Sequence, residues 1–149
     1  MTEQESIGRI INCLHRQAAR YFEREMAKFD LSSGTYHYLI TLFHKDGINQ
    51  NELTKRLRFD KANTARSLKK LQELGYIKRV RDEHDARAYM IYLTDKAIAI
   101  KPHIKNILRH WSKILTDGFM PEEKKQAVQL VKRMADNAVT HLNISNMNH

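Results

Sequence analysis

The spacing of apolar residues changes once along this chain, and that change constrains the fold more than any other feature. Up to Gly75 the apolar residues recur at steps of three and four, which is the period of amphipathic helices. Two runs rich in aromatic and β-branched residues, 76–80 and 89–93, then replace that pattern, as in a β-hairpin. Helical spacing resumes after Thr94. The sequence therefore predicts a mostly helical α+β chain with one small hairpin.

Turn and capping residues divide the first part of the chain into helices. The first helix is expected over 7–26, and the polar stretch 30–34 ends it. Ser32 or Ser33 is expected to cap a second helix, because a serine hydroxyl can accept a hydrogen bond from a free N–H group of the first turn. That helix should end at Gly47, which accepts the left-handed backbone conformation found after helix ends.

Two further helices are expected between Gly47 and the hairpin. Asn49 is a good N-cap for a short helix, and Glu52 can reach back to it as in a capping box. Asp60 can cap the following helix, which stops at Gly75. The residues expected on the inner face of that helix are Ala62, Ala65, Leu68, Leu71 and Leu74.

Two more helices follow the hairpin, one from Thr94 and one from about Pro121. The middle of the chain then reads as a helix-turn-helix followed by a hairpin, which is the element order of a winged helix. A length of 149 residues fits one domain. We therefore expect a winged helix-turn-helix over 32–93, flanked by helical regions at 1–30 and 94–143.

The positive charge of the chain is concentrated rather than spread over its surface. The formal net charge is +9, and residues 53–81, with ten Lys or Arg against two acids, carry +8 of it. A concentrated basic patch attracts a polyanion, usually nucleic acid. An ordinary solvated helix face is the alternative interpretation of the same residues.

The helix that follows Asp60 has the polar outer face that a recognition helix needs. The first residues of such a helix meet base edges in the major groove, and its flanks touch phosphate. The residues expected to point outward are Lys61, Asn63, Thr64, Arg66, Ser67 and Lys70. Asn pairs with adenine, Arg with guanine, and Ser or Thr with either base, so four of these side chains are expected to select bases: Asn63, Thr64, Arg66 and Ser67. Lys69 and Lys70 are expected to act on phosphate.

The loop of the hairpin supplies a second candidate contact. The strands leave 81–88 as a projecting tip in which Arg87 can enter a minor groove, where narrow A·T-rich segments concentrate negative potential. Asp85 can hydrogen-bond the Arg87 guanidinium or the loop backbone and so fix its direction. Arg79 and Arg81, at the end of the first strand, are further candidate DNA contacts.

Several of these motifs together resemble the MarR (multiple antibiotic resistance regulator) family of winged helix-turn-helix transcription regulators. The resemblance rests on the runs 50–57, 60–66 and 75–77, on Asp85-x-Arg87, and on Leu93-Thr94. It covers nearly the whole chain. It implies a sequence-specific regulator of transcription on double-stranded DNA, expected to be a repressor, with the DNA roles of Asp85 and Arg87 given above.

The resemblance also implies a symmetric homodimer formed by the first helix and the last two. Apolar residues of the terminal helices agree with this, including Ile7, Ile11, Leu14 and Val131. The alternative is that they pack within one chain. Two positions depart from the family pattern, Ala97 where Gly is common and Met120 where Ser or Thr is common. Both concern helix starts rather than DNA contacts.

Other residues suggest roles for which the sequence gives less support. Cys13 lies near Arg9 and Arg16 on one helix face, which favours a reactive thiolate and hence oxidant sensing; the alternative is a small residue at the edge of the dimer core, where free Cys is often buried. Four residues are candidates to line a small-molecule effector cleft: Tyr21, Tyr36, His37 and Trp111. Core packing is again the alternative. The effector itself is not named by the sequence.

Several functional classes lack a signature in the sequence. No pair of histidines has helical metal-ligand spacing with an acid between them, and no P-loop or nucleophile elbow is present, so no metal, no cofactor and no enzymatic activity are expected. No run approaches the roughly 20 apolar residues of a membrane helix. The acidic start of the chain and its single cysteine favour the cytoplasm. A winged-helix module that binds RNA or another protein remains the alternative function.

Overall fold

The computed structural model of the chain describes residues 6–32 and 34–147, with side chains to residue 143. These residues divide into two compact units, one ending at Trp111 and the other beginning at Ser112. The elements up to the end of the fifth α-helix are α1 (Ile7–Met26), the 3-10 helix η2 (Ala27–Phe29), α2 (Tyr36–His44), β1 (Ile48–Asn49), α3 (Gln50–Leu57), α4 (Lys61–Glu73), β2 (Ile77–Arg81), β3 (Tyr89–Leu93) and α5 (Asp95–Leu115). The second unit contains α6 (Pro121–Met147). The predicted order of helices and hairpin is confirmed.

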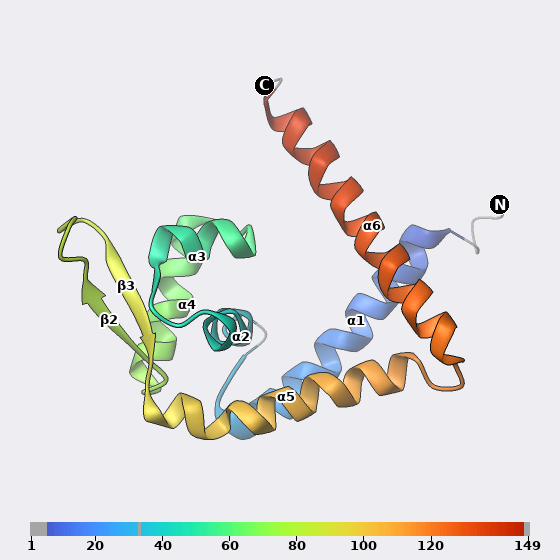
Figure 1. Ribbon diagram of the computed structural model, residues 1–149, viewed down its shortest axis with the longest axis horizontal. Coiled ribbons are helices and arrows are strands. Elements are labelled where there is room, and N and C mark those ends of the chain that lie inside the picture. Colours follow the sequence, from blue (N-terminus) through green and yellow to red (C-terminus); the bar gives the residue numbers. More distant parts are fainter. Residues whose placement is uncertain (1–5, 33, 148–149) are drawn as a thin grey trace. The chain divides into compact units, whose positions relative to one another are not determined.

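The hairpin belongs to a three-stranded antiparallel sheet with the order β1-β3-β2 (Figure 1). Ile77 pairs with Leu93 and Arg81 with Tyr89, so the hairpin lies where the alternating runs predict it. The third strand is only two residues long, and it pairs Ile48 with Ile91. A segment that short has no readable period, which is why the sequence did not predict it.

The core of the first unit lies where the helices meet the sheet. Fully buried side chains come from every layer of it, including Tyr38 and Leu42 of α2, Leu53 of α3, Ile91 of β3 and Ile104 of α5. Figure 1 shows α2, α3 and α4 grouped beside the sheet as a helix-turn-helix with its wing. Because these side chains are buried between the helices and the sheet, their packing holds the helices at fixed angles to the wing.

The start of α2 differs from the expectation. Its N-cap is Thr35, and no side chain caps it. Ser32 lies one turn earlier, where its N–H donates to the Thr35 hydroxyl at 3.0 Å and its carbonyl accepts from Thr35 and Tyr36. Ser33 lies outside the described residues. The Ser32 hydroxyl shares a 3.2 Å hydrogen bond with the Thr35 hydroxyl instead of capping the helix, so the Ser32 prediction was wrong.

The caps of the helix-turn-helix are largely as predicted. The Asn49 side chain accepts from the Asn51 N–H at 2.8 Å, and the Asp60 carboxylate accepts from the Asn63 N–H at 2.6 Å. Glu52 does not close a capping box, because its carboxylate pairs with Lys45 at 3.3 Å and with Arg56 at 3.0 Å. Gly75 follows α4 with a φ of +81°, as expected for a residue that ends a helix.

The inner face of α4 is rotated relative to the prediction. Four residues of α4 are buried, namely Thr64, Ser67, Leu68 and Leu71, whereas Ala62 and Ala65 are exposed. The Thr64 hydroxyl shares a 3.2 Å hydrogen bond with the Tyr38 hydroxyl and also donates to the Asp60 carbonyl. The Ser67 hydroxyl donates to the Gly34 carbonyl at 3.1 Å. The Thr64 hydroxyl therefore joins α4 to α2, and the Ser67 hydroxyl joins it to the turn before α2. Both hydroxyls are satisfied inside the protein, so the prediction that these two side chains point outward was wrong.

Candidate nucleic-acid interface

The exposed face of α4 is cationic and begins at the first turn of the helix. Between residues 61 and 70, the exposed charged residues are Lys61, Arg66, Lys69 and Lys70. Asn63 is half-buried, and its backbone N–H is held by the Asp60 cap. Of the side chains expected to meet DNA from this helix, the structure therefore leaves these five available and removes Thr64 and Ser67.

The tip of the wing is built by two aspartates that accept from backbone N–H groups. Asp82 accepts from His84 at 2.9 Å, and Asp85 accepts from Arg87 at 3.0 Å. Backbone hydrogen bonds between Asp82 and Ala88 and between Ala88 and Asp85 close the tip. Asp85 thus orders the loop through its backbone, one of the two roles considered for it, and the Arg87 side chain is exposed.

Arg79 has a different environment from the other wing cations. Its guanidinium donates to the Gln50 side-chain oxygen of α3 at 3.1 Å and lies 4.4 Å from the centre of the Tyr89 ring. Its Nε is buried and has no hydrogen-bond partner among the described residues. Arg79 therefore joins the wing to α3, whereas the other two cations of β2, Lys78 and Arg81, are exposed, and Arg81 is the one next to the tip.

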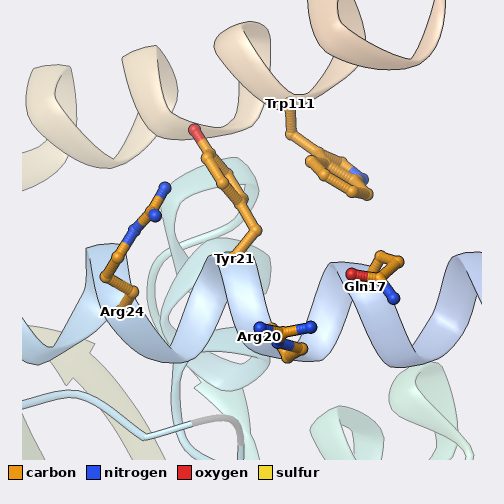
Figure 2. Close-up of a pocket in the computed structure, with 5 residues that line it drawn as sticks. All are labelled: Gln17, Arg20, Tyr21, Arg24 and Trp111. Carbon is orange, nitrogen blue, oxygen red and sulfur yellow. The ribbon is translucent and has the colours of Figure 1, made fainter.

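A pocket of about 340 Å³ lies between α1 and α5 in the first unit, lined by Gln17, Arg20, Tyr21, Arg24 and Trp111 (Figure 2). Figure 2 shows Tyr21 extending from α1 toward α5, next to the indole of Trp111. The two rings stack with centres 5.0 Å apart, and the Tyr21 hydroxyl donates to the Ile107 carbonyl. Burial raises the pKa of Tyr21, with a further contribution from Glu25. The pocket combines an aromatic wall with two arginines.

The other two residues predicted for an effector cleft do not line this pocket. Tyr36 is buried against Phe22 with ring centres 5.3 Å apart, and burial raises its pKa. His37 lies 4.0 Å from Tyr36 between ring centres, and burial lowers its pKa. Tyr36 is therefore part of the core, and the half-buried His37 ring lies against it at the end of the aromatic packing that starts at Trp111 and Tyr21.

Three pocket residues were missed at the sequence level. Gln17 and Arg24 lie four and three residues from Tyr21 and so share its face of α1, and Arg20 lies three residues from Gln17 and four from Arg24. That spacing is visible in the sequence, but it becomes a signal only once Tyr21 is known to face α5.

Cys13, the oxidant-sensing candidate, is exposed on α1.

Metal-binding clusters and membrane-spanning helices are not found in the described part of the chain. In residues 6–32 and 34–147, no three His, Cys, Asp or Glu side chains converge as a metal site would require. Within the same residues, none of the helices has the length and apolar character needed to cross a bilayer.

Comparison with known proteins agrees with this architecture. The family model described as transcriptional regulator SarA/Rot matches residues 20–104. The HTH-type transcriptional regulator BilQ of Clostridioides difficile (strain CD3) is 30% identical over 127 residues, which cover 85% of this chain and 86% of BilQ. A MarR transcriptional regulator from Methanosarcina mazei Go1 is 34% identical with a TM-score of 0.85, over 90% of this chain and 96% of that one.

A more distant structure shares the fold alone. The MarR family regulator from Listeria monocytogenes solved in complex with 26mer DNA has a TM-score of 0.82 at 22% identity, and the match covers 89% of each chain. The helix-turn-helix, the wing and the two closer relatives all lead to one assignment. The chain belongs to the MarR family of DNA-binding winged-helix transcription regulators.

Proposed function

We propose that this protein is a homodimeric repressor that binds a near-palindromic operator in the cytoplasm. The observation that carries the proposal is the cationic outer face of α4, which starts at the helix N-terminus and lies beside a wing with an exposed arginine. Recognition helices use their first turns to reach base edges in this way. A module that binds single-stranded RNA is not favoured, because no aromatic side chain of α4 is available for stacking on unpaired bases.

Exposed apolar residues support the homodimer. Four apolar residues of α1 are 44–53% exposed, namely Ile7, Ile10, Ile11 and Leu14. In α6, Val128, Leu130 and Val131 are 51–67% exposed. Contiguous apolar surface of this kind marks an interface with another protein. A second copy of the chain is the partner that the proposal assigns to both helices.

Selection of bound sequences from a random pool of DNA duplexes tests the proposal. The selected site should be a near-palindrome with half-sites about 10 base pairs apart, or a multiple of that, because a two-fold dimer places two copies of α4 in the major groove on one side of the duplex. A pool of single-stranded RNA, treated identically, should yield no enrichment. An asymmetric DNA site, or stronger enrichment of RNA, would overturn the proposal.

A variant of α1 provides the control for the dimer. Leu14→Asp places a charge in the exposed apolar stripe, so the dimer should dissociate to monomers by analytical ultracentrifugation. Its circular dichroism should be unchanged, since Leu14 is 45% exposed and lies outside the core. The variant should bind the selected site at least tenfold more weakly. A monomer that binds with undiminished affinity would contradict the dimeric model.

Arg87 is proposed to contact the minor groove, and Asp85 to hold the wing tip. Arg87→Ala should weaken operator binding by about 10- to 100-fold, most for sites with A·T-rich flanks, with thermal stability nearly unchanged because the side chain is exposed. Asp85→Ala should be partly defective, and the double variant should bind about as weakly as Arg87→Ala, because the two residues act as one unit. Fluorescence anisotropy titration measures all three.

Asp82→Ala is the matched control for the wing. It removes the hydrogen bond to the His84 N–H but leaves the one that orders Arg87. It should therefore lose less affinity than Asp85→Ala. Normal operator binding by Arg87→Ala would remove the wing contact from the model while leaving the role of α4 intact.

The pocket between α1 and α5 supports a small-molecule signal as part of this function. Arginine guanidinium groups with a stacked aromatic wall suit an aromatic or apolar anion. We propose Gln17, Arg20, Tyr21, Arg24 and Trp111 as its site, in place of the quartet expected from the sequence. Release of the operator by such a ligand would make the repressor inducible.

A further inference from the structure

The cationic face of α4 contains two alanines that its inner packing leaves outside. Ala62 and Ala65 are exposed and three residues apart, so they lie on adjacent turns of one helix face. Lys61, Arg66 and Lys69 surround them and are also exposed. An alanine side chain extends only one methyl group from the backbone, so at these two positions α4 can come closer to a partner than the lysines and arginine alone would allow.

The polar core of α4 explains why the alanines occupy this face. Thr64 and Ser67 take the inner positions, where their hydroxyls bond to Tyr38 and to the Gly34 carbonyl. Those two hydrogen bonds fix the rotation of the helix about its axis. Ala62 and Ala65 are therefore held on the outer face by contacts in which they take no part.

A methyl group selects among bases by contact rather than by hydrogen bonding. In the major groove thymine is the one base that presents a methyl group, at C5, and apolar side chains such as alanine meet it there. An alanine placed against the exposed amino group of cytosine or adenine offers no acceptor, so that polar group loses water without a new partner. Two methyls on the outer face of a recognition helix thus favour thymine at the positions they reach.

We infer that Ala62 and Ala65 read the C5 methyl groups of thymines in each half-site, while Arg66 and the lysines around them bind guanine or phosphate. The inference rests on the proposed DNA binding and specifies what the exposed face selects. Asn63, expected from the sequence, then selects bases together with Arg66. The two alanines take the place of Thr64 and Ser67, the hydroxyl residues that the sequence suggested. The competing explanation is that alanine is present only because it is the strongest helix former.

Replacing thymine by uracil in the selected operator separates these explanations, because uracil pairs identically and lacks only the methyl. Each thymine of one half-site is replaced in turn, and the dissociation constant is measured by anisotropy. One or two positions should show about a fourfold weakening, the equivalent of one buried methyl group. The same replacement in both half-sites should weaken binding roughly fifteenfold, provided that the half-sites act independently.

Glycine variants identify which residue reads each methyl. Ala62→Gly or Ala65→Gly should bind the thymine duplex about fourfold more weakly and lose the uracil penalty at its own position. Ala99→Gly, at an exposed site on α5, imposes the same loss of helix propensity and should keep both the affinity and the penalty. Circular dichroism checks that each variant is folded.

Two different failures can be told apart. A flat uracil scan with tight operator binding, or a penalty that survives in both glycine variants, would overturn the thymine inference and leave DNA binding established. Absence of specific binding to any thymine-containing duplex would instead overturn the proposed function. The wild-type scan needs no variant, so the inference is tested even if a glycine variant does not fold.

Discussion

Raising the salt concentration from 50 to 200 mM should weaken operator binding by about a thousandfold, provided that a dimer neutralises about six phosphates in total. The exposed cations of α4 and the wing that are available for this are Lys61, Arg66, Lys69, Lys70, Lys78, Arg81 and Arg87. Each neutralised phosphate releases condensed counterions, so the logarithm of the binding constant should fall with the logarithm of salt concentration at a slope near −0.9 per contact.

The control for salt dependence removes charge without touching base-reading positions. Lys69→Gln and Lys70→Gln together should make the slope less steep by about one unit for each phosphate that is no longer neutralised, and should weaken specific and random duplexes about equally. Anisotropy titrations at several salt concentrations measure the slopes. A wild-type slope shallower than about −2 would mean that the cationic face does not lie against the DNA backbone.

Gly47→Ala should lower the free energy of unfolding by about 2–4 kcal/mol, the largest stability effect we expect from so small a change. Gly47 has a φ of +69°, which an alanine adopts at a cost, and an added Cβ would lie 2.9 Å from Cε1 of the Tyr92 ring. Asp46 accepts from both the Gly47 N–H and the Leu93 N–H, so the two backbone segments stay close together and the Tyr92 ring must turn aside to make room for the methyl group. Urea denaturation measures the change.

Two other glycines separate backbone strain from collision. Gly75 has a φ of +81°, but an added Cβ would meet only Lys96 at an ordinary 3.7 Å, so Gly75→Ala should lose about 1 kcal/mol. Gly8→Ala, in α1 with no positive φ, should gain about 0.5–1 kcal/mol. If Gly47→Ala is no more destabilising than Gly75→Ala, the contact with Tyr92 contributes nothing.

Element order was predictable because it depends on patterns that extend over many residues. The runs 76–80 and 89–93 predicted the wing to within one residue, and the caps at Asn49 and Asp60 and the stop at Gly75 were confirmed. Each of these signals has a local physical cause, either a side chain that accepts a backbone hydrogen bond or a glycine that takes a left-handed conformation. Local causes are visible without the fold.

The rotation of α4 was not predicted, although part of the signal was present. A stripe at strict steps of three, from Ala62 to Leu74, drifts around the helix, because one turn contains 3.6 residues. Thr64, Ser67, Leu68 and Leu71 follow the steps of three and four that one helix face requires, but two of them are polar. Only the fold shows that Tyr38 and the Gly34 carbonyl satisfy their hydroxyls. Tertiary hydrogen bonds of this kind are not encoded in sequence spacing.

The stack of Trp111 on Tyr21 has a practical consequence for spectroscopy. Trp111 is the single tryptophan of the chain, and it is half-buried at the edge of the pocket between α1 and α5. Indole fluorescence depends on the polarity and contacts of the ring, and Tyr21 lies 5.0 Å away between ring centres. When the unlabelled protein is excited at wavelengths that tyrosine does not absorb, its emission therefore has one source, located at this pocket. A ligand that enters can be titrated optically, with no dye attached and no other tryptophan contributing background.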